Sequence, residues 1–155
     1  MVFTAGGYPN VGAGLPFRVP ETQVEQLIYI STARSIVLSA AEIQDILEAS
    51  RHNNARDGLT GLLIVGDRRF LQVLEGDGAA LERAYARIKA DPRHFAMVEL
   101  GRKSISQREF GDWAMGYESG GEDLRSTVSV LTNRVADPSL KAQLQSFADI
   151  HTRAA

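Results

Sequence analysis

The stretch Phe70–Gly76, FLQVLEG, has the composition and the boundaries of a buried β-strand. Successive side chains of a strand point to opposite faces, so Phe70, Gln72 and Leu74 share one face. An amide buried between two large apolar side chains costs roughly 1–3 kcal/mol if it has no hydrogen-bond partner. We therefore expect Gln72 to contact a polar neighbour or ligand that offers both a donor and an acceptor.

Composition narrows the class of protein around this strand. The chain has 155 residues, 44% hydrophobic and 23% charged, which is ordinary for one globular domain. A net charge of −2 favours neither nucleic acid nor an anionic membrane as a partner, and the absence of cysteine excludes disulfides, thiolate catalysis and cysteine-ligated metals. No apolar run approaches the roughly 20 residues of a membrane helix, and the N-terminus lacks a secretory signal pattern. We expect a cytoplasmic protein without a metal.

Turn residues and hydrophobic periodicity divide most of the chain into strands and helices. Besides 70–76, the predicted strands cover residues 26–31, 58–66, 95–103 and, with an internal turn, 105–117. A capping box of Ser39 and Glu42 begins a helix that ends near Asn54. A second helix begins near Asp77 and ends before Pro92. The order βαββαββ predicts an α+β fold, a ferredoxin-like sandwich with a five-stranded mixed sheet and two helices on one face.

Two further helices are predicted after the last strand. Apolar residues recur at helical spacing over 124–135 and again over 140–147. We expect these helices to cap the second face of the sheet, although the same stripes would suit a partner or a dimer interface. The predicted organisation is a Gly- and Pro-rich N-terminal extension (1–25), a ligand-binding body (26–118) and a C-terminal two-helix cap (119–155).

A candidate pocket forms where polar side chains converge between the sheet and the helices. Strand pairing would bring Tyr29 close to Gln72, beneath the helix that ends in the asparagines at 53–54. Trp113 and Met115, as i and i+2 of the last strand, are expected on one face, with Trp113 near the pocket. Each feature also has a plainer explanation: a core tyrosine, a fraying helix end and ordinary core packing.

Together, an amide, a phenol, an indole and two carboxamides suit a flat heteroaromatic ligand with alternating donors and acceptors. A flavin fits that description, and other nucleobase-like ligands fit it too. The pocket has no Ser-His-Asp arrangement, no pair of acids at its centre and no cluster of metal ligands.

Six separate motifs of this chain resemble those of BLUF domains, the bacterial blue-light sensors that use FAD. The motifs are LIYIS at 27–31, SRHNN at 50–54, GLTGLL at 58–63, FLQVLEG at 70–76, DPRH at 91–94, and Arg, Phe, Trp and Met at 108, 110, 113 and 115. The resemblance covers residues 26–117 and implies the fold predicted above. It also implies FAD as the cofactor, no enzymatic turnover, and an oligomeric sensor that signals to an effector protein.

The resemblance implies a role for each pocket residue. Tyr29 would give an electron and then a proton to the excited flavin, while Gln72 would bridge Tyr29 and the N5 and C4 carbonyl region. Asn54 would bond the edge of the isoalloxazine ring, with Asn53 flanking the ring and Ser50 near the Tyr29–Gln72 pair.

Four more positions are implied at the site. Arg93 and His94 would lie near the ribityl and ring side of the flavin. Trp113 and Met115 would exchange places beside the flavin and pass the signal into the last strand and the C-terminal helices. A rearranged Gln72 amide would change the hydrogen bond at the flavin carbonyl and shift the absorption to the red.

Two other classes of function fit the same fold. A flavin-dependent redox enzyme would turn over a substrate and would not need Tyr29. A light-independent ligand-binding regulatory module would purify without colour.

Overall fold

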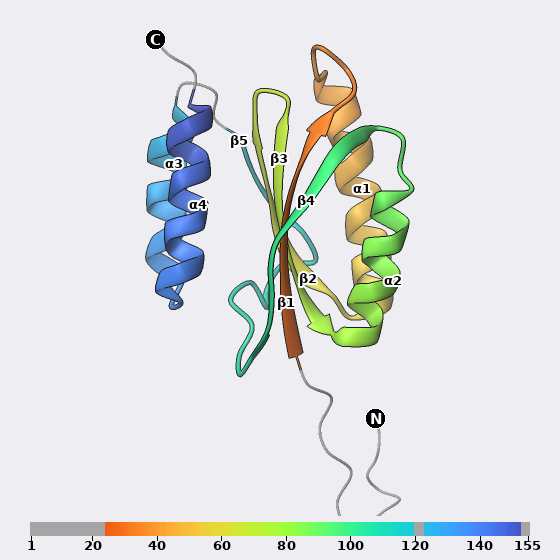
Figure 1. Ribbon diagram of the computed structural model, residues 1–155, viewed down its shortest axis with the longest axis vertical. Coiled ribbons are helices and arrows are strands. Elements are labelled where there is room, and N and C mark those ends of the chain that lie inside the picture. The colour runs from red at the N-terminus through yellow and green to blue at the C-terminus, as the bar shows by residue number, and fades with distance from the viewer. Residues whose placement is uncertain (1–23, 120–122, 153–155) are drawn as a thin grey trace, which may run out of the picture.

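The computed structural model describes residues 24–119 and 123–152 (Figure 1). Its elements follow in the order β1 (Val24–Ala33), α1 (Ala40–Asp57), β2 (Thr60–Gly66), β3 (Arg69–Asp77), α2 (Gly78–Lys89), β4 (His94–Ile105), β5 (Gly116–Ser119), α3 (Leu124–Leu131), the short 3-10 helix η3 (Thr132–Arg134) and α4 (Pro138–His151). The predicted βαββαββ order and the two helices after it are confirmed. Of the extension predicted for 1–25, only Val24 and Glu25 lie in the described part, where they begin β1.

The strands form one five-stranded mixed sheet in the order β4-β1-β3-β2-β5. β1 pairs antiparallel with β3 and β4, and β2 pairs antiparallel with β3 and parallel with β5. Helices α1 and α2 cover one face, and α3 and α4 lie against the other (Figure 1). The predicted ferredoxin-like α+β sandwich is therefore confirmed.

β3 lies in the middle of the sheet and contributes to a core on each side. Phe70 and Leu74 pack in the core beneath α1 and α2, whereas Leu71 and Val73 pack in the core beneath α3 and α4. The alternation predicted for FLQVLEG is confirmed. It directs Gln72 toward the side of α1 and α2.

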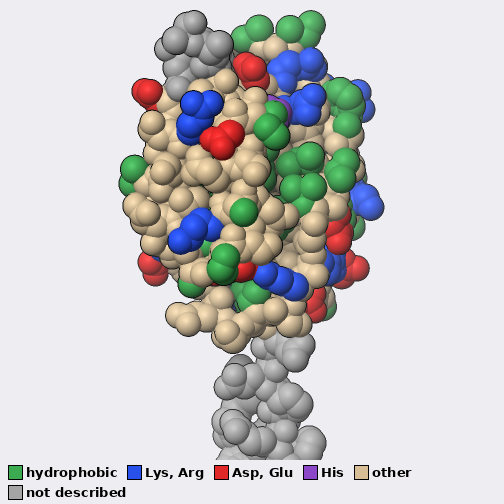
Figure 2. Space-filling model, turned by 60° about the vertical axis from the view of Figure 1, so that its left-hand side comes forward, with side chains coloured by type: hydrophobic (Ala, Val, Ile, Leu, Met, Phe, Trp, Pro, Cys, Tyr) green, Lys and Arg blue, Asp and Glu red, His purple; other side chains and the backbone are tan. Residues whose placement is uncertain are grey.

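Apolar side chains remain at the surface along β4, an edge strand. Phe95, Val98 and Leu100 are 40%, 51% and 40% exposed, and Figure 2 shows hydrophobic side chains gathered on one side of the molecule. Among the described residues, the core beneath α3 and α4 draws on β1, β2 and β3 but not on β4. The C-terminal helices therefore cap only part of the second face.

The predicted helix caps are confirmed, but one predicted helix end is not. The capping box stands at the start of α1, and Asp77 caps α2. α1 continues past Asn54 to Asp57, because Gly58 adopts the left-handed conformation (φ 72°) that ends a helix and donates its N–H to the Asn54 carbonyl. Asn54 therefore lies in an ordered helix and not at a frayed end.

The predicted last strand is wrong over most of its length. Residues 106–115 form a loop, which we call the 106–115 loop, and only Gly116–Ser119 form β5. The prediction that Trp113 and Met115 share a face is also wrong, since Trp113 packs with the core beneath α3 and α4 and Met115 with the core beneath α1 and α2. A turn interrupts strand alternation here, because the Trp113 N–H donates to the Phe110 carbonyl at 3.0 Å.

Within residues 24–119 and 123–152, none of the helices has the length and apolar character that crossing a bilayer requires. The same part of the chain holds no group of three or more histidine or acidic side chains arranged to bind a metal ion.

Candidate functional site

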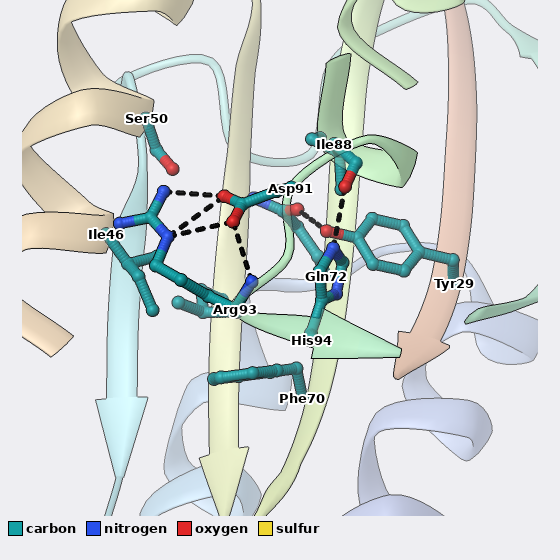
Figure 3. Close-up of a pocket in the computed structure, with 10 residues that line it drawn as sticks. Tyr29, Ile46, Ser50, Phe70, Gln72, Ile88, Asp91, Arg93 and His94 are labelled. Carbon is teal, nitrogen blue, oxygen red and sulfur yellow. Dashed lines mark hydrogen bonds and ion pairs between the residues drawn. The ribbon is translucent and has the colours of Figure 1, made fainter. Parts of the chain in front are cut away.

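A pocket that is partly open to solvent lies between the sheet and helices α1 and α2 (Figure 3). The residues that line it come from β1, β2, β3, α1, α2 and the segment that enters β4. They are Tyr29, Ile46, Ser50, Leu63, Phe70, Gln72, Ile88, Asp91, Arg93 and His94.

Tyr29 and Gln72 face each other across β1 and β3, where they are register partners. Each is 4% exposed, and the Tyr29 hydroxyl donates a hydrogen bond to Gln72 Oε1 (Figure 3). Burial raises the pKa of the Tyr29 hydroxyl well above its ordinary value, and the neighbouring Tyr85 and Asp91 side chains add to the effect. The phenol therefore stays protonated, and the buried amide has the partner that its position requires.

The other half of the Gln72 amide contacts the 106–115 loop. The amide nitrogen donates to the thioether sulfur of Met115 at 3.4 Å. A thioether accepts hydrogen bonds but cannot donate them, so a half-turn of the amide would place its oxygen against another acceptor. The two contacts together favour one orientation of the Gln72 amide.

The last turns of α1 hold the end of the 106–115 loop. Asn54 Nδ2 donates to the Ala114 carbonyl at 2.7 Å, and Arg51 Nε donates to the Met115 carbonyl at 3.0 Å. Sequence reasoning missed Arg51 as a site residue, because nothing in its spacing distinguishes it from an ordinary surface arginine. Its partner lies 64 positions further along the chain.

Two basic residues line the pocket near the start of β4 (Figure 3). His94 Nε2 lies 2.7 Å from the Ile88 carbonyl, which can only accept, so Nε2 carries a proton, and Nδ1 lies 2.8 Å from Ser31 Oγ. The Arg93 guanidinium bonds Asp91 at distances of 2.6 and 3.0 Å, and this interaction lowers the pKa of the Asp91 carboxyl. Asp91 thus holds the Arg93 guanidinium beside the pocket. From the sequence alone, Asp91 is expected mainly to end α2.

The structure brings together most of the predicted site residues. Those that line the pocket are Tyr29, Ser50, Gln72, Arg93 and His94. Met115 is not one of the lining residues, but it contacts one of them, Gln72. Asn53 and Asn54 lie on α1 outside the lining, and Asn54 bonds the 106–115 loop.

Trp113 lies on the far side of the sheet from the pocket, contrary to the prediction. Its ring stacks on Phe110, with 6.0 Å between centroids and 9° between planes, and the Arg134 guanidinium lies 4.2 Å over it. Gly116 permits this arrangement, since a Cβ there would lie 2.4 Å from the indole. Met115, and not Trp113, contacts Gln72.

Known proteins share the part of the chain that carries the pocket. Residues 24–116 match the family model described as BLUF, sensors of blue-light using FAD. The chain is 32% identical over 96 residues to the photoactivated adenylate cyclase subunit alpha of Euglena gracilis, a match that covers 61% of this chain and 9% of that protein.

Solved structures agree with this match. The dark-state structure of BlrB, a BLUF protein, has a TM-score of 0.66 at 29% identity and covers 83% of this chain and 98% of that one. The manganese and cy-diGMP complex of Klebsiella pneumoniae BlrP1 has a TM-score of 0.69 at 28% identity and covers 81% of this chain and 33% of that one.

Proposed function

Since the chain belongs to the BLUF family, the sensors of blue light using FAD, we propose that its pocket binds the isoalloxazine ring of FAD and that Tyr29 and Gln72 carry the light response. One observation supports this most directly. A continuous chain of hydrogen bonds runs from the Tyr29 hydroxyl through the Gln72 amide to the Met115 sulfur. It joins an oxidisable phenol to an amide that can exchange donor and acceptor, and then to a loop.

The pocket residues suit a flavin, which has broad apolar faces and polar groups along one edge. Ile46 and Ile88 offer apolar surface, and the Gln72 amide has a second N–H besides the one that it gives to Met115. The Arg93 guanidinium bonds Asp91 through Nε and Nη2, and its Nη1 group would be able to donate to an oxygen of the cofactor. FAD is proposed over FMN because the family description names FAD.

Four other predicted contacts belong to this proposal. Ser50 and His94 line the pocket and would contact the cofactor directly. Asn54 gives its amide nitrogen to the Ala114 carbonyl, so its oxygen would accept from an N–H at the flavin edge. Asn53, half-buried beside it, would flank the ring.

When it is bound and excited by blue light, the flavin supplies a one-electron oxidant. Tyr29 would give up the electron, and its hydroxyl proton would then pass to the flavin by way of the Gln72 amide, to which the hydroxyl already donates. The Gln72 amide would rotate or tautomerise before the electron and the proton return to Tyr29. No substrate is consumed. After the electron and the proton have returned, the Gln72 amide presents an N–H donor at the place where it presented a carbonyl acceptor before.

An absorption spectrum of the FAD-loaded protein, before and just after a blue flash, tests this function. We expect a yellow protein whose flavin bands move slightly to the red and return in darkness. Bleaching to reduced flavin would favour a redox enzyme instead. A protein that stays colourless after reconstitution with FAD would overturn the proposal.

We propose that the output is binding to an effector protein, without catalysis by this chain. The matched region makes up 9% of the Euglena cyclase and 33% of BlrP1, so related modules occur within much longer proteins. In the described residues, the surface beside β4 and the two C-terminal helices offers area for such contact. The oligomer and the cytoplasmic location stay predictions.

A further inference from the structure

The 106–115 loop contributes to both faces of the sheet. Met115 at its end contacts Gln72, while Phe110 is fully buried in the core beneath α3 and α4. A change at Gln72 that moves Met115 therefore acts on a segment that also supports the C-terminal helices. The contacts that fix the start of the loop decide where such a movement is transmitted.

Glu75 fixes the start of the loop from β3, the strand that also carries the pocket amide. Its carboxylate is 0% exposed and accepts from the backbone N–H groups of Glu109 at 2.7 Å and Phe110 at 2.9 Å. The Thr60 hydroxyl and the Gln26 amide donate to the same carboxylate, each at 3.2 Å. A buried carboxylate depends on such donors, so Glu75 keeps this part of the loop attached to β3.

Glu109 extends the connection to α4. Its own carboxylate accepts from the backbone N–H groups of Ala136 at 3.0 Å and Asp137 at 3.1 Å. These residues come just before α4, so the carboxylate lies at the positive end of the helix dipole. The ion pair between Lys103 and Asp137 at the same place joins side chains that are 46% and 21% exposed, and such pairs contribute little.

We propose that Glu75 and Glu109 are positioning residues that couple the Gln72 amide to α4. The inference rests on the proposed function, since it needs a light-driven change at Gln72. When Met115 moves away from Gln72, the 106–115 loop turns about the point where Glu75 holds the backbone of Glu109 and Phe110. This rotation redirects the Glu109 carboxylate and shifts the beginning of α4, which that carboxylate contacts. A carboxylate is needed at position 109 because a neutral amide offers only one accepting oxygen for the two N–H groups of Ala136 and Asp137.

Hydrogen exchange of α4, measured on the FAD-loaded full chain in darkness and under continuous blue light, tests this coupling. In the wild type, we expect α4 amides to exchange at rates that differ about fivefold or more between the two conditions. Glu109→Gln should keep the full red shift of the flavin but lose the light-dependent difference. Glu48→Gln, which removes an exposed carboxylate from α1, is the matched control and should keep both.

Either of two results overturns the coupling: a Glu109→Gln protein whose α4 responds to light as the wild type does, or a wild type that shows the red shift with unchanged α4 exchange. If the wild type shows no red shift at all, the proposed function is itself refuted. The connection between Met115 and α4 is then tested in darkness. Met115→Ala should alter the hydrogen exchange of α4 in the protein that has Glu109, but not in the protein that also carries Glu109→Gln. Equal effects of Met115→Ala with and without Glu109→Gln would refute it.

Discussion

The amide nitrogen of Gln72 and the sulfur of Met115 lie 3.4 Å apart, and this contact joins the pocket to the loop that leads into β5. It follows from the sheet topology. Gly116 is opposite Leu62 in the parallel β2–β5 pair, and Leu63 is opposite Gln72 in the β2–β3 pair. Met115, one residue before the pairing of β5 begins, therefore lies within reach of β3.

Replacing Gln72 by Leu tests the amide itself. The substitution keeps a side chain of similar size and leaves the apolar walls intact, so FAD should still bind. The red shift should be lost, because no group remains that can exchange a donor for an acceptor. The measurement is the light-minus-dark spectrum at equal bound flavin, with Gln44→Leu on the exposed side of α1 as control. A wild-type red shift in Gln72→Leu would assign the response to another group.

Replacing Met115 by Leu removes the acceptor but keeps the apolar volume. The bond that the Gln72 nitrogen donates to the sulfur should be worth about 0.5–1 kcal/mol, so the substitution makes the resting state, which contains this bond, less stable. We expect the return of the flavin bands to the resting state in darkness to slow about two- to fivefold, because about 0.5–1 kcal/mol corresponds to a change of that size in a rate constant. The time course of flavin absorbance measures it, and Met97→Leu on β4 is the control. Unchanged or faster recovery would show that the sulfur does not stabilise the resting state.

Arg51 holds the end of the 106–115 loop from α1, so Arg51→Gln should loosen that loop. The free energy of unfolding should fall by about 0.5–1 kcal/mol, as for one hydrogen bond near the surface, and urea denaturation measures it. Trypsin should also cleave after Arg108 faster than in the wild type, because cleavage follows local opening. Arg83→Gln, at an exposed position of α2, is the control. Equal cleavage of the wild type and Arg51→Gln would mean that this contact does not hold the loop.

Local patterns were enough to predict most of the fold. The alternation of FLQVLEG, the capping box at Ser39 and the cap at Asp77 each depend on residues a few positions apart, and all three are present. The antiparallel pairing of β1 and β3 then places Tyr29 opposite Gln72. The centre of the pocket is predictable because it rests on strand periodicity.

The 106–115 loop could not be predicted in this way. Its course is fixed by contacts with Glu75, Arg51 and Asn54, which lie 34 to 64 positions away in the chain. Strand periodicity placed Trp113 and Met115 on one face, but the turn in this loop sends them to opposite sides of the sheet. Long-range backbone contacts of this kind leave no periodic signal in the sequence.

His151, the last residue of α4, determines one part of the pH dependence of stability. Its ring centroid lies 4.5 Å from that of Phe147, and burial, with Arg69 nearby and Asp67 opposing, lowers the pKa of His151 below the ordinary 6.5. A histidine with a lowered pKa in the folded state is protonated first in the unfolded chain. The stability that it contributes is therefore complete above pH 6.5 and is lost as the pH falls below that value.

Between about pH 7 and pH 5, the urea midpoint should fall less steeply for His151→Asn than for the wild type. Lys141→Gln, exposed on the same helix, leaves the ring in place and should keep the wild-type slope. Parallel curves for His151→Asn and the wild type would mean that burial of this ring does not contribute to the pH dependence.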